Sequence, residues 1–557
     1  MLRHYCALAL LIAAPACLAQ NLAQDRNPFP VSAAAASAAA ASASQPASRT
    51  NSPTLAKAAP KTTTQAAPPA GPPIAPSTSA APFVASAPLN LVLKDARWFD
   101  GQGFKRNTLY VVDGKFTTVK PKRVNRSMDL KDQFLVPPLA DAHNYNLQND
   151  WAVGQYAQRY VRDGVFYAAM MCADAAAADA ARKSLEDADG PEALFVTACI
   201  TSGDGQPLGA LLDASPGKSR ADFIDKAVIV IDKPDDVARK WPLVMAGKPT
   251  AIRLMLVQSD RPELHARGEL WGRLGVTPEV ATAITQRAHK AGLHVIAHVE
   301  TAADFANAVK AGVDWIDHVP GFVDPLGDPA ERFALTPEMA ADAAKAEVSV
   351  VTGVAAAKLF NARPELQTAL AAVLKRNLQT LKDAGVTLLL GSDLFTDTAQ
   401  AELRALAATG VFSNAELLRM ATITTPRALF PKRRIGCFET GCEASFLLLG
   451  ADPTADLQTL AAPMLRAQEG RLLTQNLDVA EKSDESSIST DAAKKKASAA
   501  TKGSKSTGKS GKHASSTSAS SSKSSAKSTG THKAPAKTST KTPAKSGHAA
   551  SGAAASK

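Results

Sequence analysis

Apolar and polar positions follow two different rhythms along this chain. Between residues 89 and 130, short apolar runs broken by turn signals such as Asp113-Gly114 predict β-strands at 89–100, 109–120 and 127–130. From residue 134 onward, short apolar runs alternate with stretches whose apolar residues recur at helical spacing. Eight such alternations favour a parallel (β/α)8 barrel over an antiparallel fold.

The α/β barrel of TIM type is expected over residues 134–434. Apolar strands return at 445–450 and 464–473, and we expect them to pair with the strands before the barrel. The segments 88–133 and 435–475 would then form a small composite β-sandwich. The predicted barrel strands are 134–146, 164–172, 194–201, 251–257, 294–299, 313–319, 348–354 and 387–393, with helices that include 337–346, 366–384 and 415–429.

One strand, helix and strand unit, residues 294–321, is especially clear. Thr301 and Asp304 have the spacing of a capping box, and Gly312 can adopt the left-handed conformation that ends a helix. If the two flanking strands are parallel neighbours, His298 and His318 emerge side by side at the carboxyl edge, where barrel enzymes keep their chemistry. Taken alone, a histidine at a strand end is more often structural than a ligand.

The two ends of the chain lack the composition of a folded domain. Residues 1–19 combine Arg3, an apolar run and small residues, which predicts a secretory signal cleaved after Ala19; a lipoprotein signal using Cys17 is the weaker alternative. Residues 20–87 consist mainly of Ala, Pro, Ser and Thr, which predicts a disordered linker. We therefore expect an exported protein, periplasmic or extracellular, with no transmembrane span.

A lysine-rich tail explains the overall charge. Residues 492–557 hold fourteen lysines and no acidic residue, and removing them from the net charge of +11 leaves −3 for residues 1–491. The region 476–557 is predicted to be disordered and to bind polyanions, such as envelope polymers or anionic lipid head groups, rather than a specific nucleic acid. A tail that only solubilises the protein is the alternative.

Four cysteines lie outside the signal. Cys172 and Cys199 fall at the ends of consecutive predicted strands, and Cys437 and Cys442 bracket the sequence FETG. An oxidising compartment would allow these two pairs to form disulfides, although four buried thiols fit the same spacing.

Motifs at four strand ends resemble those of a known superfamily. DAHNYN at 141–146, AHV at 297–299, DHV at 317–319 and AGVTLLLGSD at 384–393 occur in the order found in amidohydrolases, and 416–453 resembles the closing segment. The nearest similarity is to the exported imidazolonepropionase-like and prolidase-like branch, over about residues 88–475. The resemblance implies a metal-dependent hydrolase of amide or cyclic amide bonds.

The resemblance also implies the metal ligands. His143, His298, His318 and Asp393 match four of them, and Asp393 matches the aspartate that takes the proton of the attacking water. Imidazoles and a carboxylate suit zinc or another divalent metal with one position left for water.

Two positions depart from the family pattern. Tyr145 replaces the second histidine of the first motif, and Arg253 stands where the family carboxylates a lysine to bridge two metals. A guanidinium cannot form that carbamate, and its fixed charge repels metals. Three interpretations remain: a mononuclear hydrolase with about one metal per chain, a catalytically inactive barrel in which Arg253 pairs with Asp393, or a shifted alignment of the fourth strand.

The sequence therefore predicts an exported amidohydrolase-like enzyme acting on a small-molecule amide. The alternative is an inactive protein of the same fold that binds envelope polyanions through its tail. The remaining histidines, His265, His289 and His294, fit surface or packing roles, and the turn-rich loop 203–209 has a minor chance of shaping the pocket.

Overall fold

The computed structural model describes residues 81–475, except 174, 197, 325 and 361–363. The chain divides into two units, residues 1–486 and 487–557. The predicted signal, the linker up to residue 80 and the basic tail lie outside the described residues. Within the part that is described, no helix is long and apolar enough to cross a membrane.

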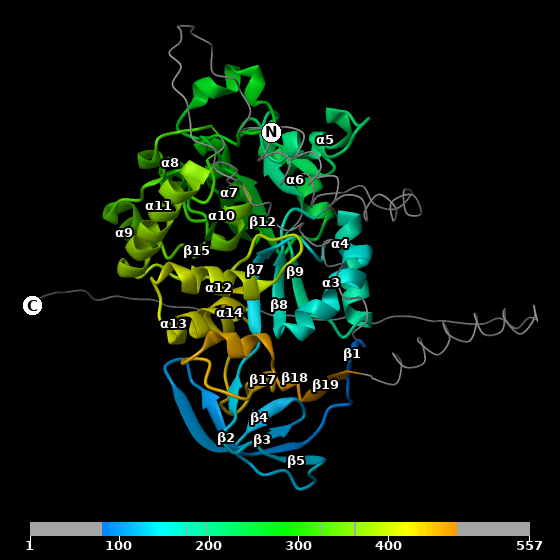
Figure 1. The fold of residues 1–557 in the computed structure, drawn as a ribbon. Coiled ribbons are helices and arrows are strands. Elements are labelled where there is room, and N and C mark those ends of the chain that lie inside the picture. The colour runs from blue at the N-terminus through cyan, green and yellow to red at the C-terminus, as the bar shows by residue number, and fades with distance from the viewer. Residues whose placement is uncertain (1–80, 174, 197, 325, 361–363, 476–557) are drawn as a thin grey trace, which may run out of the picture. The chain divides into compact units, whose positions relative to one another are not determined.

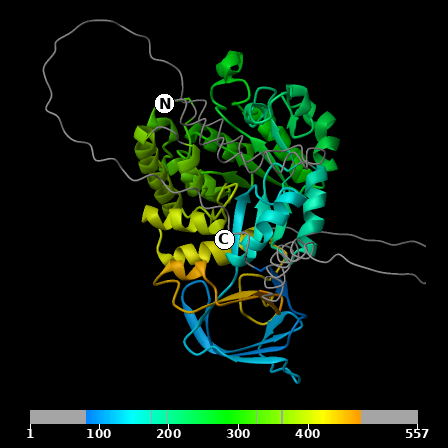
Figure 2. The ribbon, with the colours of Figure 1, turned by 45° about the vertical axis from the view of Figure 1, so that its right-hand side comes forward.

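A nine-stranded, mainly antiparallel sheet collects strands from both ends of the described chain. Figures 1 and 2 show its blue N-terminal strands beside its orange C-terminal strands in both views. Both segments expected to form a composite β-sandwich, 88–133 and 435–475, contribute strands to this single sheet, which has β6 at its centre. Its strands are β1 (Phe83–Ala85), β2 (Leu91–Phe99), β3 (Phe104–Val112), β4 (Lys115–Thr117), β5 (Arg126–Asp129), β6 (Phe134–Val136), β17 (Phe446–Leu449), β18 (Leu465–Gln468) and β19 (Arg471–Gln475).

Pairing between distant segments holds this sheet together. Parallel pairing of β6 with β2 and antiparallel pairing of β6 with β17 join its two halves. A core of its own forms where Trp98, Phe116, Phe438 and Phe446 pack together. Burial of such aromatic side chains stabilises a small sheet that local contacts alone would not.

Two predicted boundaries need correction. The run 134–146 was expected to be one barrel strand, but it divides at Pro137-Pro138, which lack the backbone N–H groups that a continuous ladder needs. Its first part belongs to the nine-stranded sheet. Strand β1 lies inside the predicted linker and pairs with β19.

Parallel strands with intervening helices form the larger part of the structure. Strand order is β11-β10-β12-β13-β14-β15-β16 in one sheet and β7-β8-β9 in another, and every pair in both is parallel. The ladder is thus divided and does not form one continuous closed barrel. These strands are β7 (Leu139–Asn144), β8 (Val165–Met170), β9 (Glu192–Phe195), β10 (Cys199–Thr201), β11 (Val228–Val230), β12 (Ala251–Met255), β13 (His294–His298), β14 (Trp315–Asp317), β15 (Ser349–Val351) and β16 (Leu388–Leu389).

Individual backbone hydrogen bonds connect the last parallel strand to the first. Ala142 N–H donates to the Leu390 carbonyl at 2.8 Å, and Asp393 N–H donates to the His143 carbonyl at 2.8 Å. These bonds bring the end of β16 beside the end of β7.

The predicted third strand, 194–201, is divided into β9 and β10, and β11 was not predicted.

Helices cover the parallel strands, as Figure 1 shows for α3 and α4 beside β8 and β9. The prediction for residues 301–312 is confirmed, because α8 has a reciprocal capping box between Thr301 and Asp304 and ends at Gly312 with φ 77°. The helices are α3 (Asp150–Arg162), α4 (Ala175–Asp187), α5 (Leu208–Asp213), α6 (Asp236–Ala246), α7 (Pro278–Lys290), α8 (Ala302–Ala311), α9 (Pro337–Lys345), α10 (Val354–Phe360), α11 (Pro364–Asp383), α12 (Ala399–Thr409), α13 (Asn414–Arg419) and α14 (Thr425–Leu429).

Candidate active site

The site residues lie at the carboxyl ends of neighbouring parallel strands. His143 is on β7, His298 ends β13, His318 follows β14 and Asp393 follows β16. Arg253 points to the same place from β12. Because the carboxyl ends of parallel strands meet at one edge, the fold gathers residues separated by up to 250 positions.

Three of the four predicted ligands form a compact cluster. His143, His318 and Asp393 are buried, and one donor atom from each lies within 4.8 Å of the others. Asp393 Oδ1 is 3.2 Å from His143 Nε2, and Asp393 Oδ2 is 3.7 Å from His318 Nε2. Neither ring nitrogen of His318 has a hydrogen-bond partner among the described residues. This donor set fits a single divalent metal.

Charge inside the cluster is set by its carboxylates. Burial by itself would lower the pKa of His143, but Asp317 and Asp393 raise it well above its ordinary value. Burial lowers the pKa of His318 well below its ordinary value. The pKa of Asp393 would be raised by burial, yet His143 and His318 hold it below its usual range. At neutral pH the cluster therefore contains an ionised Asp393 and a neutral His318.

The backbone at two of these residues is strained. His318 has φ 76° and Asp393 has φ 50°, in the left-handed region that costs a side-chain-bearing residue about 1–3 kcal/mol. A Cβ at Gly353 would lie 2.7 Å from His318 Nδ1, so only glycine leaves room for that ring. Strain of this kind is retained where the surrounding structure fixes a functional conformation.

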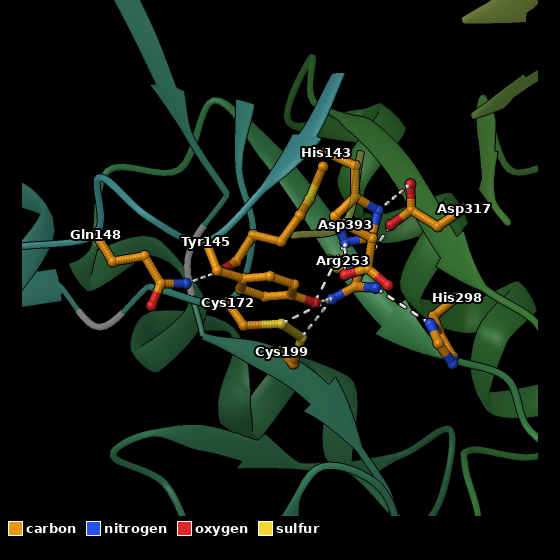
Figure 3. The surroundings of a disulfide bond; sticks show 10 residues. His143, Tyr145, Gln148, Cys172, Cys199, Arg253, His298, Asp317 and Asp393 are labelled. Carbon is orange, nitrogen blue, oxygen red and sulfur yellow. Dashed lines mark hydrogen bonds and ion pairs between the residues drawn. A yellow bond between two sulfur atoms is a disulfide. The ribbon is translucent and has the colours of Figure 1, made fainter. Parts of the chain in front are cut away.

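Arg253 occupies the centre of the site. Its Nε donates to Asp317 Oδ2 at 2.9 Å, and its Nη1 donates to the hydroxyl of Tyr145 at 2.7 Å. Its Nη2 lies 3.1 Å from His298 Nδ1. Figure 3 shows the guanidinium between Tyr145 and His298. The ion pair with Asp317 corrects the expectation that Arg253 would pair with Asp393.

His298 stands apart from the three-residue cluster. Since a guanidinium can only donate, His298 Nδ1 must accept from Arg253. Burial and the charge of Arg253 lower the pKa of His298 well below its ordinary value, so the ring is neutral and carries its proton on Nε2. A protonated nitrogen cannot bind a metal. The proposed role of His298 as a ligand is therefore not supported by its surroundings.

A cavity of about 320 Å³ opens onto these residues. Its lining includes Tyr145, Arg253, His298, His318 and Asp393. The lining also includes Gln206 and Pro207 from the loop 203–209, the segment for which pocket shaping was the minor alternative, and Glu300, Phe322 and Phe395.

Asp317 and Glu300 were not predicted as site residues. Asp317 is held between two cations, because His143 Nδ1 lies 3.4 Å from its Oδ1 while Arg253 binds its Oδ2. Glu300 Oε1 accepts from Gln206 Nε2 at 2.6 Å, and burial raises the pKa of Glu300 to about 8. The only sequence signal for these two residues was their proximity to the strand-end histidines: Asp317 directly precedes His318, and Glu300 lies two residues after His298.

Both predicted cysteine pairs are joined in disulfides, Cys172–Cys199 and Cys437–Cys442. The first lies beside the site, with Cys172 Sγ 3.1 Å from Arg253 Nη1. The second disulfide joins two members of another potential metal-binding cluster, Cys437, Glu439 and Cys442, so these sulfurs are unavailable to a metal.

The three remaining predicted histidines pair with acids outside the site: His265 with Asp204, and His289 and His294 with Asp314.

Sequence comparison identifies the parallel-strand region. The sequence model of the amidohydrolase family matches residues 260–467, a range that includes the strand ends bearing His298, His318 and Asp393. The matched segment, residues 260–467, belongs to the amidohydrolase family. The predicted resemblance is thus confirmed, and the family consists of hydrolases that act on C–N bonds. No curated protein matches this chain.

Solved structures support the fold of the chain. A Xaa-Pro dipeptidase with bound methionine is 16% identical, with a TM-score of 0.55, over 70% of this chain and 100% of that one. The ochratoxinase of A. niger is 18% identical, with a TM-score of 0.55, over 70% and 96%. Molinate hydrolase is 15% identical, with a TM-score of 0.54, over 69% and 94%. At these identities the likeness establishes the shared α/β architecture with its additional domain.

Proposed function

We propose that this amidohydrolase is an exported enzyme that hydrolyses an amide or cyclic amide C–N bond with a single divalent metal, zinc or a similar ion. The observation that carries the proposal is the convergence of His143, His318 and Asp393 beside the cavity. All three are buried, and His318 has no competing partner among the described residues. The structural similarity to a Xaa-Pro dipeptidase and to ochratoxinase is consistent with an amide substrate.

A second metal does not fit this site. In the family pattern a bridging carbamate and a second histidine would hold it, whereas here Arg253 and Tyr145 hydrogen-bond to each other in those positions. At about 4 Å and an effective dielectric near 20, each pair of unit charges costs about 4 kcal/mol. A guanidinium fixed by Asp317 and Tyr145 therefore disfavours a binuclear centre.

The residues present divide the chemistry among them. A metal held by His143, His318 and Asp393 would supply a water of lowered pKa and Lewis-acid polarisation of the substrate. The ionised Asp393 carboxylate would accept the proton of that water and return it to the leaving nitrogen. Phe322, stacked on the His318 ring, and Phe395, stacked on Tyr145, provide apolar walls that limit bulk water.

Elemental analysis of protein purified without chelator tests the proposal. We expect about one metal per chain in the wild type, none in His318→Ala, and a value rising toward two in the Arg253→Lys, Tyr145→His double variant. His289→Ala is the matched control, because His289 is exposed and pairs with Asp314 away from the site. Absence of metal from the wild type would contradict the proposal.

A non-catalytic protein that binds anionic envelope polymers through its basic tail is the second candidate. The buried Arg253–Asp317 pair favours it, because an ion pair stabilises the site without any metal. Dialysis against chelator separates the two functions. Loss of a hydrolytic activity supports the enzyme, whereas unchanged behaviour with salt-sensitive binding to anionic polymer supports the second candidate.

A further inference from the structure

We propose that Tyr145 and His298 form an oxyanion-binding pair, positioned by Arg253, that takes the place of the second metal. The inference rests on the proposed hydrolysis of an amide. It concerns the two departures from the family pattern, Tyr145 and Arg253, which the single-metal mechanism leaves without a role.

The first donor is the hydroxyl of Tyr145. Its oxygen accepts a hydrogen bond from Arg253 Nη1 at 2.7 Å. The other polar neighbour is His143 Nε2 at 3.3 Å, which also faces Asp393 Oδ1 at 3.2 Å. The lone pair of His143 Nε2 is occupied, either by a proton shared with Asp393 or by a metal. This nitrogen therefore cannot accept a hydrogen bond from the Tyr145 hydroxyl. The phenolic proton is therefore free to donate into the cavity that Tyr145 lines.

The second donor is the Nε2–H of His298. Arg253 Nη2 donates to His298 Nδ1, which places the ring proton on Nε2. Nε2 is buried and has no hydrogen-bond partner among the described residues; the nearest carboxylate oxygen, Glu300 Oε1, is 3.8 Å away. An unpartnered buried donor costs about 1–3 kcal/mol, so a ligand that accepts from it gains affinity.

The Arg253 guanidinium hydrogen-bonds to both donor residues. Arg253 contacts Tyr145 and His298 through different nitrogens, and Asp317 on Nε together with the Cys172 sulfur beside Nη1 restricts its movement. Figure 3 shows Tyr145 and His298 on opposite sides of the guanidinium. The positive charge of the guanidinium polarises both donors, and both residues line the cavity. Arg253 is thus a positioning residue, and Tyr145 and His298 are the groups that would touch the substrate.

Negative charge develops on the carbonyl oxygen of an amide bound in the cavity that Tyr145 and His298 line. When the water oxygen bonds to the amide carbon, the carbonyl electron pair moves onto oxygen and the water proton moves to Asp393. Collapse of the tetrahedral adduct restores the carbonyl, breaks the C–N bond and sends that proton to the leaving nitrogen. Fixed donors aimed at the oxyanion stabilise it without reorganisation, and each contributes about 10²–10³-fold in rate.

Methylphosphonate, a small tetrahedral anion, is the probe for this site. Its affinity is measured by calorimetry on zinc-loaded and on metal-stripped protein. We expect Tyr145→Phe and His298→Phe each to weaken binding by about 10-fold or more, the effect of one hydrogen bond to a charged group. Tyr110→Phe and His289→Gln, which lie outside the site, are the controls. Equal affinity in the wild type and both site variants, or no binding to the wild type, would overturn the inference.

The tautomer of His298 in the wild type gives a readout that depends neither on activity nor on a variant. Nitrogen-15 NMR of the wild-type imidazoles should show His298 protonated on Nε2, and Arg253→Lys should weaken that preference. Protonation on Nδ1 in the wild type would refute the role of Arg253. Protein purified without chelator that contains no metal, yet binds methylphosphonate through Tyr145 and His298, would contradict the proposed hydrolase but not the anion site.

Discussion

Replacing Arg253 by methionine tests whether the guanidinium stabilises the site. Arg253 is 2% exposed and Asp317 is fully buried, and their atoms lie 2.9 Å apart. Removing one member of a buried ion pair typically costs about 3–5 kcal/mol, because the other charge is left without its partner. His143 Nδ1 remains 3.4 Å from Asp317 Oδ1 and compensates in part for the lost positive charge of Arg253. We therefore expect the free energy of unfolding to fall by about 3 kcal/mol.

Urea unfolding of metal-stripped protein with intact disulfides provides the measurement. The Arg253→Met, Asp317→Asn double variant should recover at least about 1 kcal/mol, because it removes the stranded charge. Arg239→Met is the matched control, since Arg239 forms an exposed pair with Asp236 of a kind worth about 1 kcal/mol or less. A loss for Arg253→Met no greater than that of the control, with an unchanged denaturant slope, would refute the reasoning.

Further predictions concern protonation, capping and the tail. Because the pKa of His143 is raised, metal binding must displace its proton, so zinc affinity measured by chelator competition should rise about 10-fold per pH unit below that pKa; a pH-independent affinity would contradict this. Since the pKa of Glu300 is about 8, methylphosphonate affinity in the wild type should decline relative to that of Glu300→Gln as the pH rises above about 8. Thr301→Ala, which removes the N-cap of α8, should lower the free energy of unfolding by about 1 kcal/mol in urea titrations; no change would mean that the cap is not stabilising. Deleting residues 492–557 should abolish heparin binding and leave the melting temperature unchanged; an earlier melt would show that the tail is not independent.

Local sequence signals predicted local structure well. The capping box at Thr301 and the left-handed Gly312 bounded α8 correctly because both depend on interactions within a few residues. The division of 134–146 was missed, although Pro137-Pro138 carried the signal. The two cysteine pairs were identified with thiols as the alternative, since spacing alone cannot distinguish a disulfide from two separate thiols.

Residue types and their order along the chain determined the candidate site: histidines and an aspartate at successive strand ends, with Tyr145 and Arg253 in place of family residues. Only the tertiary structure decided their partners. On β13, His298 is paired with Met255 of β12 on one side and with Asp317 of β14 on the other. This register brings Arg253 to Asp317 rather than to Asp393. Side chains on a strand alternate in direction, so a shift of one residue between neighbouring strands would exchange these contacts. Such a register is set by the packing of all the parallel strands and their helices, which no single segment encodes.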